Sequence, residues 1–359
     1  MQFKKKLNNL NKIYIIFFYF VLFINIFFTS SLKANSFKIA NLEISEPFKL
    51  NFNKEKVMGK GFKLAFLELA SMITTSGDKK KIEDTSLATI KSLIDSFTMS
   101  NERFINNEYR VKFDVNFNKK NTLNFFESEN IFPSIPKKKN LLLIPVMVDL
   151  ESDQISLFNN NIFYEKWNNN NKRYFLLNYI LPTEDLEDVD LLSQNSQSIE
   201  DYDFRKIIKK YDLNDFIITI IYKDNDNLTV LSKIQLNKSF KVQNKKFENI
   251  NLFHEKDLNL VLNDLKTTYE NYWKNINKIN TSIKLPLTIS VNASEHKKIQ
   301  TFENGLDELD LVSNFEILSL NNNNIYFKII YNGSPNRFIN EIKMKGIEIN
   351  TQNQIWEVQ

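Results

Sequence analysis

YRVKFDVNF, at residues 109–117, decides the fold of the first part of this 359-residue chain. Its apolar residues alternate strictly with polar ones, and they are Tyr109, Val111, Phe113, Val115 and Phe117. Successive side chains of a β-strand point to opposite faces of the sheet. The alternation therefore predicts a strand with one face on a core and the other in water.

A helix is predicted on the N-terminal side of this strand. Between residues 54 and 73, apolar side chains recur at steps of three and four, which places them on one helix face. They are Val57, Met58, Phe62, Ala65, Phe66, Leu69, Ala70 and Ile73. Similar patterns predict a strand at 37–46 and further helices at 86–98 and 122–128. We expect residues 35–132 to form an N-terminal α+β module.

A proline-containing linker is expected after this module. Residues 132–140 contain Pro133, Pro136 and three lysines. Proline fixes φ and has no amide hydrogen, so this stretch disfavours a continuous helix or a central strand. We expect a domain boundary here, followed by a central module at 137–282 and a C-terminal module at 284–359.

The central module is predicted to be α/β. Its expected strands are 141–148, which has the length of a buried strand, 174–181, 216–222, 228–236 and one near 246–252. An acidic stretch at 184–190 precedes an expected helix, whose start carries Ser198 and Asp201 at capping-box spacing. Residues 224–227 suit a hairpin turn, and residues 256–276 suit a long helix.

The C-terminal module has the predicted order βαββαβ. The expected strands are 285–291, 314–320, 325–331 and 347–358. A first helix is expected to be capped by Asn292, with Glu295 three residues later, and a second helix is expected at 335–345. This order is typical of a ferredoxin-like arrangement, in which two helices cover one face of a four-stranded antiparallel sheet. The whole chain is therefore expected to be a multi-domain protein of the α/β and α+β classes.

The first 34 residues have the pattern of a bacterial secretory signal peptide. They contain five lysines and no acidic residue, with an apolar run at 13–28 and small residues up to Ala34. We expect cleavage between Ala34 and Asn35 and a periplasmic location. An uncleaved anchor in the inner membrane, facing the periplasm, is the alternative, because the apolar run is only slightly short of a membrane span.

Charge and cysteine content narrow the classes of partner and site. The chain has 47 Lys and Arg against 43 Asp and Glu, and its excess of positive charge lies in the predicted signal peptide. A nucleic-acid partner is not expected, because such proteins keep a basic patch in the folded domain. The chain has no Cys, which fits an oxidising compartment and excludes thiolate ligands and nucleophiles.

No catalytic, cofactor-binding or metal-binding residue is predicted. His254 and His296 are the only histidines, and both are expected at helix starts, where a surface or capping role is the simpler interpretation. Gly59, Lys60 and Gly61 lack the spacing of a phosphate loop and fall inside a helical pattern, so we expect Gly61 to admit a close neighbour.

Three further features have simpler interpretations than a site. Asp224 and Asp226 resemble the start of a calcium loop without its later glycine and glutamate, and a turn fits them better. The acidic stretch 184–190 is interpreted as a solvated loop. Trp167 and Trp273 are expected in a core or an interface.

Several of these landmarks together resemble a family of exported, mostly alphaproteobacterial proteins known as domain of unknown function 2066. They are Gly61, Phe62, Ala65, Phe66 and Leu69 of the helix, the alternating strand 109–117, the strand segment 142–146, and Trp167. The resemblance implies an envelope protein of unassigned activity and no catalytic residues. The central region is also similar in outline to small α/β modules of periplasmic assembly proteins.

The sequence favours a non-enzymatic binding or scaffold protein of the cell envelope, whose partner is another envelope protein. Two alternatives remain open. One is a periplasmic hydrolase or carbohydrate-acting enzyme that uses an Asp/Glu pair, since such chemistry needs neither His nor Cys. The other is a module held at the inner membrane by the uncleaved signal segment, which would be its only contact with the membrane.

Overall fold

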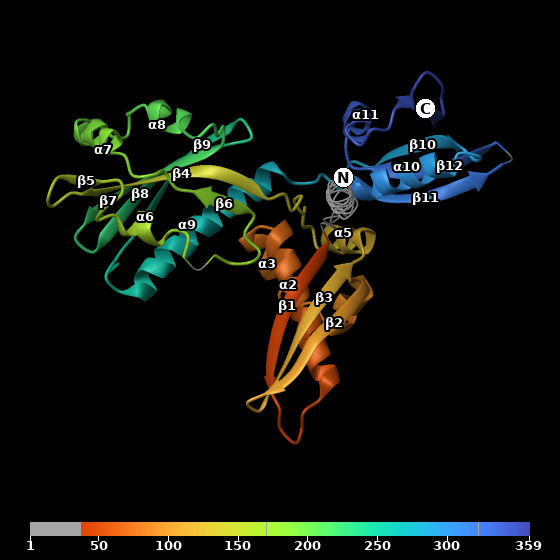
Figure 1. Cartoon of the computed structure of the whole chain (residues 1–359), viewed down its shortest axis with the longest axis horizontal. Helices are drawn as coiled ribbons and strands as arrows, with labels where there is room; N and C mark the ends of the chain where they lie inside the picture. Colours follow the sequence, from red (N-terminus) through yellow and green to blue (C-terminus); the bar gives the residue numbers. More distant parts are fainter. Residues whose placement is uncertain (1–36, 170, 322) are drawn as a thin grey trace, which may run out of the picture. The chain divides into compact units, whose positions relative to one another are not determined.

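A computed structural model describes residues 37–169, 171–321 and 323–359 of the chain. The predicted signal peptide, with its cleavage site at Ala34 and Asn35, lies outside these residues. Within them the protein is a mixed α/β structure with ten α-helices and three sheets (Figure 1). The N-terminal and C-terminal sheets each have one hydrophobic core, and the central sheet has a core on each face.

The N-terminal sheet is antiparallel, with strand order β1-β3-β2. Its strands are β1 (Lys38–Pro47), β2 (Ile94–Ile105) and β3 (Glu108–Phe117), the last of which is the strand predicted from alternation. The apolar residues of β3 are buried, while their polar neighbours lie on the other face. One face of this sheet therefore carries the core.

Helix α2 (Lys54–Ile73) covers that face, with the bounds expected from the sequence. Its side chains Ala65, Phe66 and Leu69 are fully buried. Asn53 begins the helix, because its Oδ1 accepts hydrogen bonds from the backbone N–H groups of Glu55 and Lys56. The spacing of the apolar residues and the capping residue thus explain both the start and the orientation of α2.

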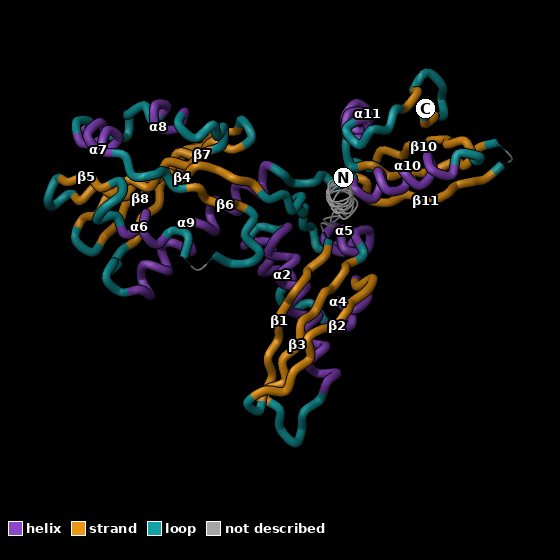
Figure 2. Tube along the Cα trace, viewed as in Figure 1, coloured by secondary structure: helices purple, strands orange, loops and turns teal. Residues whose placement is uncertain are grey.

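The helix predicted at 86–98 is wrong in its second half. Helix α4 (Leu87–Leu93) ends at Leu93, and β2 begins at Ile94. Pairing with β3 satisfies the backbone of β2, and the ring of Phe97 packs edge-on against Phe62 at 4.9 Å. The remaining helices of this module are α3 (Ser76–Ile82), which was not predicted (Figure 1), and α5 (Lys119–Ser128), which is labelled in Figure 2.

The central module contains a mixed sheet of six strands. Their order is β5-β4-β7-β8-β9, and β6 pairs with β4. Their bounds are β4 (Lys139–Asp149), β5 (Gln154–Ser156), β6 (Leu177–Ile180), β7 (Phe216–Asp224), β8 (Asn227–Leu236) and β9 (Ser239–Phe247). Strand β4 runs parallel to β7 and β6, and the turn predicted between β7 and β8 is present.

Both faces of this sheet are covered. Leu141 and Leu143 of β4 face a core that includes helix α9 (Glu255–Ile276), and Leu142 and Ile144 face a second core on the other side. A strand buried on both faces has no polar positions to alternate with, which explains its continuous apolar sequence. Helix α9 has the bounds expected from its apolar stripe, apart from one residue at its start.

Three expectations for this module are wrong. The acidic stretch is not a loop, because residues from Glu187 to Asp190 lie in helix α7 (Leu186–Ser193). Ser198 does not begin a helix but ends a short 3-10 turn, and the next helix is α8 (Arg205–Lys209). The third hairpin strand is β9 rather than 246–252, because Asn237 and Lys238 form a tight turn directly after β8. The remaining helix of the module is α6 (Ile162–Lys166).

The C-terminal module contains a five-stranded sheet in the order β11-β12-β10-β14-β13. Its elements are β10 (Leu285–Asn292), α10 (His296–Glu308), β11 (Val312–Leu320), β12 (Asn324–Tyr331), α11 (Pro335–Lys343), β13 (Ile349–Asn350) and β14 (Trp356–Val358). The core lies between the helices and the sheet and includes Phe302, Phe327 and Phe338, which are fully buried.

The expected four-stranded antiparallel sheet is corrected at its last strand. The polar residues 351–355 turn the chain, so that β13 and β14 form a small hairpin. Strand β14 consequently runs parallel to β10. The predicted cap is also wrong, since Glu295 precedes α10 and Asn292 Oδ1 instead accepts a hydrogen bond from the Ser294 backbone N–H.

Asparagine occupies most of the left-handed turn positions. Twelve non-glycine residues of the described chain have positive φ, and nine of them are Asn. Asn tolerates this conformation better than most residues, because its short side chain can hydrogen-bond locally. The turns are therefore built with only one glycine at positive φ among the described residues, Gly346.

Among the described residues, no helix has the length and apolar character needed to cross a membrane.

Candidate functional site

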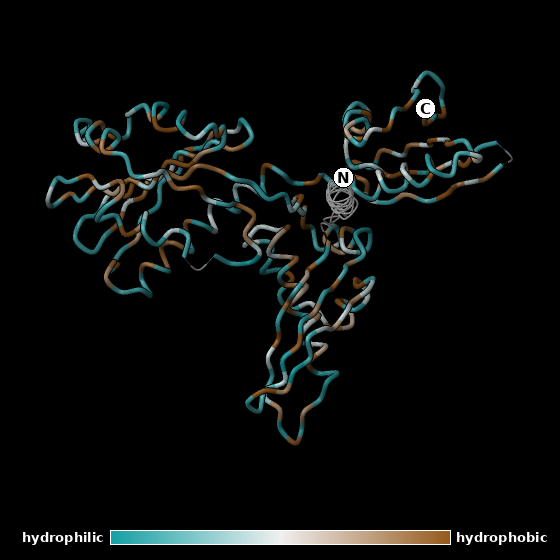
Figure 3. Tube along the Cα trace, in the orientation of Figure 1, coloured by the Kyte–Doolittle hydropathy of each residue, from teal (hydrophilic) through white to brown (hydrophobic). Residues whose placement is uncertain are grey.

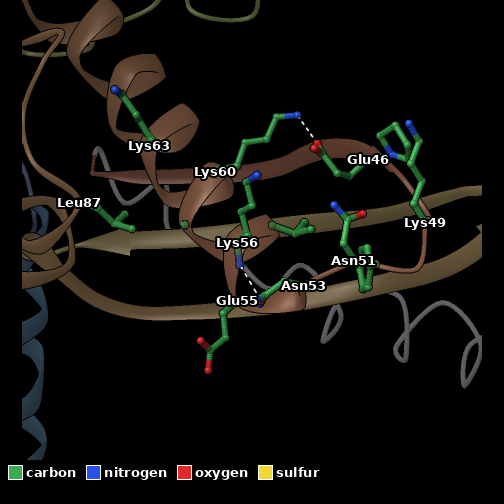
Figure 4. Close-up of a pocket in the computed structure, with 13 residues that line it drawn as sticks. Glu46, Lys49, Asn51, Asn53, Glu55, Lys56, Lys60, Lys63 and Leu87 are labelled. Carbon is green, nitrogen blue, oxygen red and sulfur yellow. Dashed lines mark hydrogen bonds and ion pairs between the residues drawn. The ribbon is translucent and has the colours of Figure 1, made fainter.

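The candidate site is a pocket of about 600 Å³ beside the first turns of α2 in the N-terminal module. Its wall is formed by the end of β1, the loop that follows, one side of α2 and a residue of α4 (Figure 4). We call it the lysine pocket, because it is lined by four lysines, which are Lys49, Lys56, Lys60 and Lys63.

Three of these lysines lie along one side of α2. Lys56, Lys60 and Lys63 are spaced by four and three residues, a spacing that brings side chains to the same helix face. Lys49 comes from the loop after β1, and all four side chains are exposed. The local sequence thus places several ammonium groups around one opening, where they attract an anionic group.

Two glutamates also line the pocket, but they neutralise only part of this charge. Glu46 forms an ion pair with Lys60, and Figure 4 shows the two side chains meeting across the pocket wall. Glu55 points away from this pair in the same view. The other three lysines form no ion pair with any residue that the structure describes.

The base of the pocket is apolar. It is formed by buried Val57, half-buried Phe52 and Leu87, the last of which is 39 % exposed. Gly59 leaves room at this base, since a Cβ there would lie 2.9 Å from Leu87 Cδ2. Apolar and cationic surfaces therefore meet in one pocket, an arrangement that suits a ligand with both an anionic and an apolar part.

Four aromatic rings support the loop that forms one side of the pocket. The ring centroid of Phe48 lies 5.0 Å from that of Phe52 and 4.9 Å from that of Phe104. The ring centroid of Tyr109 lies 4.9 Å from that of Phe52 and 5.1 Å from that of Phe104. The loop is also tied to the β2–β3 turn, because the Phe48 backbone N–H donates to the Asn107 carbonyl at 2.7 Å.

Glu102 joins this aromatic group to α2. Its carboxylate accepts hydrogen bonds from Lys54 Nζ at 2.8 Å and from the Tyr109 hydroxyl at 2.7 Å. These hydrogen bonds lower the pKa of Glu102, while burial and the nearby carboxylate raise the pKa of Tyr109 to about 12. The carboxylate and the phenol thus keep the charged and neutral forms that the hydrogen bond requires at neutral pH.

A second polar group lies inside the central module. Glu270 of α9 is 1 % exposed, and its Oε1 accepts hydrogen bonds from the backbone N–H groups of Leu176 and Leu177, each at 2.8 Å. Burial raises the pKa of Glu270. Lys266, one turn earlier, is 2 % exposed, and burial lowers its pKa to about 8.

The partners of this group indicate a structural role. Lys266 Nζ donates to Asn171 Oδ1 at 2.8 Å, so it holds the segment before β6, as Glu270 holds the start of that strand. The hydroxyl of Tyr269, between them on α9, lies 2.7 Å from Ser232 Oγ and 2.9 Å from Thr219 Oγ1. These hydrogen bonds fasten α9 to the sheet and to β6.

Neither of the two histidines lines the lysine pocket. His254 precedes α9 with an exposed side chain 3.9 Å from Asp257, and His296 is the first residue of α10. Asp224 and Asp226 lie in the turn between β7 and β8, as expected. Among the described residues, no group of three His, Asp or Glu side chains could hold a metal ion.

The remaining candidates are structural. Trp167 and Trp273 are fully buried, and the Trp167 ring stacks on Tyr269 at 6.1 Å, which confirms the expected core role. Within the acidic helix, Asp188 is 1 % exposed and pairs with Lys210 at 2.7 Å. Gly61 lies inside α2, where a Cβ would lie 3.0 Å from the ring of Phe113, so the expected close neighbour is present.

The sequence did not predict the lysine pocket. Gly59 and Lys60 were considered only as a phosphate loop, for which they lack the spacing. The pocket is made by bringing residue 87 and the loop at 47–53 against α2, which is a tertiary arrangement. The signal in the sequence was the row of lysines on one side of the predicted helix.

Comparison of the sequence with models of protein families gave no match. Comparison with curated proteins also gave no match.

Proposed function

We propose that the chain is an exported, non-enzymatic binding protein of the cell envelope, and that the lysine pocket holds the anionic group of its ligand. The observation that carries the proposal is the pocket itself, in which four exposed lysines surround an apolar base. Only one of these lysines is paired with an acid among the described residues. The pocket therefore has positive charge that is not neutralised by an ion pair within the described residues, and this charge lies beside apolar surface. Such a pocket fits an anionic amphiphile.

The proposed location follows from the first 34 residues, which have the lysines, apolar run and small residues of a signal peptide. We propose a periplasmic chain that begins at Asn35, with another envelope protein among its partners. The resemblance to domain of unknown function 2066 agrees with this location. The C-terminal module is proposed as a ferredoxin-like variant, on the strength of its strand order β11-β12-β10-β14.

A hydrolytic function gains no support from the lysine pocket. Its two carboxylates are Glu46, which is engaged by Lys60, and Glu55, which points elsewhere (Figure 4). A glycoside-cleaving site needs two carboxyl groups that face one substrate bond from opposite sides. The binding function is therefore the one we put forward.

The test is titration calorimetry of the exported protein with dodecyl phosphate at monomeric concentrations, with dodecyltrimethylammonium as the cationic counterpart. We expect saturable binding of the phosphate and weaker binding of the cation. Replacing both Lys56 and Lys63 with Gln should weaken phosphate binding by about thirtyfold, since each of the two charges near an anionic group is worth on the order of 1 kcal/mol.

The matched control replaces Lys206 and Lys209 with Gln. These lysines are also exposed and lie on helix α8 of the central module. The control should bind as tightly as the original protein. Equal affinity for the two amphiphiles, or equal effects of the two double substitutions, would contradict the proposal.

A further inference from the structure

Four large apolar side chains are exposed together next to the lysine pocket. Phe48 and Leu50 lie in the loop after β1, and Phe104 and Ile105 lie at the end of β2. Their exposed fractions are 48 % for Phe48, 111 % for Leu50, 61 % for Phe104 and 44 % for Ile105. We call this group the apolar tip, and Figure 3 shows the hydrophobic residues of the β1–α2 loop.

Ring contacts hold two members of the apolar tip, Phe48 and Phe104, in place. Phe48 and Phe104 contact each other edge-on at 4.9 Å, and the rings of Phe52 and Tyr109 support them from the core side. Leu50 is the most exposed of the four. A hollow shared by Phe48, Leu50 and Asn107 adjoins the lysine pocket, since both are lined by Pro47, Lys49 and Phe52.

Positive charge surrounds the apolar tip. Residues 46–63 and 101–110 contain seven Lys and Arg against four Glu. Three ion pairs use part of this charge, and they are Lys54–Glu102, Lys60–Glu46 and Arg110–Glu108. Arg103 and three pocket lysines form no ion pair within the described residues. The net charge of this end of the module is therefore positive.

We infer that the apolar tip docks on a membrane surface that contains anionic lipids, with Leu50 and Phe48 in the acyl region and the lysines at the lipid phosphates. An apolar group ringed by cations is the arrangement by which interfacial segments bind such surfaces. A second copy of this chain fits less well, because two tips would bring like charges together. The inference rests on the proposed function and names the source of the anionic group.

The absence of Cys from the chain permits a direct test. Leu50→Cys is labelled with a fluorophore whose emission shifts to the blue in an apolar medium, and vesicles of phosphatidylglycerol or of phosphatidylcholine are added to the exported protein. We expect a blue shift with phosphatidylglycerol that weakens as the salt concentration rises, because salt screens exposed charges. Phosphatidylcholine should give none.

The matched control is Leu320→Cys, on the exposed edge of β11 in another module, where the side chain is 68 % exposed. Its label should not shift. Adding Lys49→Glu and Lys56→Glu to Leu50→Cys should raise the lipid concentration for half-maximal shift by more than about tenfold, because two positive charges at the lipid phosphates are replaced by negative ones. The same exchange at Lys206 and Lys209 should not raise it.

An unshifted label at residue 50, or equal shifts with the two lipids or at the two labelled positions, would overturn the inference. Dodecyl phosphate binding, measured without vesicles, separates this failure from failure of the proposed function. If the soluble phosphate binds and the label on vesicles does not shift, the pocket remains an anion site and membrane docking is refuted. If neither occurs, both proposals are refuted.

Discussion

The N-terminal and central modules use polar residues in opposite ways. The strand YRVKFDVNF at 109–117 has one buried face and one polar face, and the lysines of its covering helix are in water. The strand LLLIPVMV at 141–148 is covered on both faces, and its covering helix buries Lys266 and Glu270. The central module thus uses charges to hold its own strands, whereas the N-terminal module presents them to solvent.

This difference indicates where binding and stability reside. A charge buried with hydrogen-bond partners is costly to remove, because the partners lose their bonds. An exposed charge contributes little to stability and remains available to a ligand. Substitutions in the two modules should therefore separate stability from binding.

Glu270→Ala should have the largest effect of the substitutions considered. It leaves the backbone N–H groups of Leu176 and Leu177 buried without an acceptor, which should lower the free energy of unfolding by about 2–5 kcal/mol. Urea denaturation measures this change. Glu270→Gln keeps an acceptor oxygen and should lower the free energy of unfolding by less than about half as much as Glu270→Ala. Equal losses would show that the hydrogen bonds are not the cause.

The raised pKa of Glu270 adds a pH dependence with a defined sign. The folded state binds the proton of Glu270 more tightly than the unfolded state, whose pKa is near 4.5. Stability from this group is therefore present below pH 4.5 and is lost as pH rises through the raised value. Relative to Glu270→Gln, the original protein should lose stability over that interval, as urea denaturation at several pH values would reveal.

Lys266 should give the opposite dependence at alkaline pH. Burial lowers its pKa from 10.5 to about 8, so the unfolded state binds more protons than the folded state between these values. Stability should rise with pH over this interval. Lys266→Met should reduce the slope of the free energy of unfolding against pH. The reduction should be at most about 1.4 kcal/mol per pH unit, which corresponds to one proton. An unchanged slope in urea denaturation would exclude Lys266 as its source.

The two glycines of α2 should respond differently to a side chain. Gly61→Val places atoms against Phe113 and Ile44, which are both buried, and should cost about 1–3 kcal/mol. Gly59→Ala meets only the flexible end of Leu87 and should stabilise the helix by up to about 1 kcal/mol. Thermal unfolding of both variants tests this contrast, and a loss of stability at Gly59 equal to that at Gly61 would refute it.

The accuracy of the sequence predictions followed the strength of local periodicity. Helices α2 and α9 and strand β3 were predicted almost to the residue, because many apolar positions repeat with one period. Ile94 and Phe97 fit a helical stripe as well, and only pairing with β3 makes them a strand. The polar turn at 351–355 likewise divides the single strand expected at 347–358 into β13 and β14.

The candidate site was less accessible to such reasoning than the fold. The three lysines of α2 share a helix face by their spacing, which is a local property. Their relation to Leu87, Lys49 and the aromatic rings depends on packing between segments far apart in the chain. The exposure of Leu50 and Phe48 depends on that same packing, because an isolated apolar residue in a loop can as easily face a core.

The asparagines at left-handed turns affect how this fold can be traced among other proteins. The genetic code specifies Asn by codons that begin with two adenines and Gly by codons that begin with two guanines. A chain that places Asn at nine left-handed positions of its described residues can keep its backbone path while its gene becomes rich in adenine. The glycines that ordinarily serve as landmarks in sequence alignments are then missing. A similarity of turns would therefore be detected by comparing backbone angles before it was detected by comparing sequences.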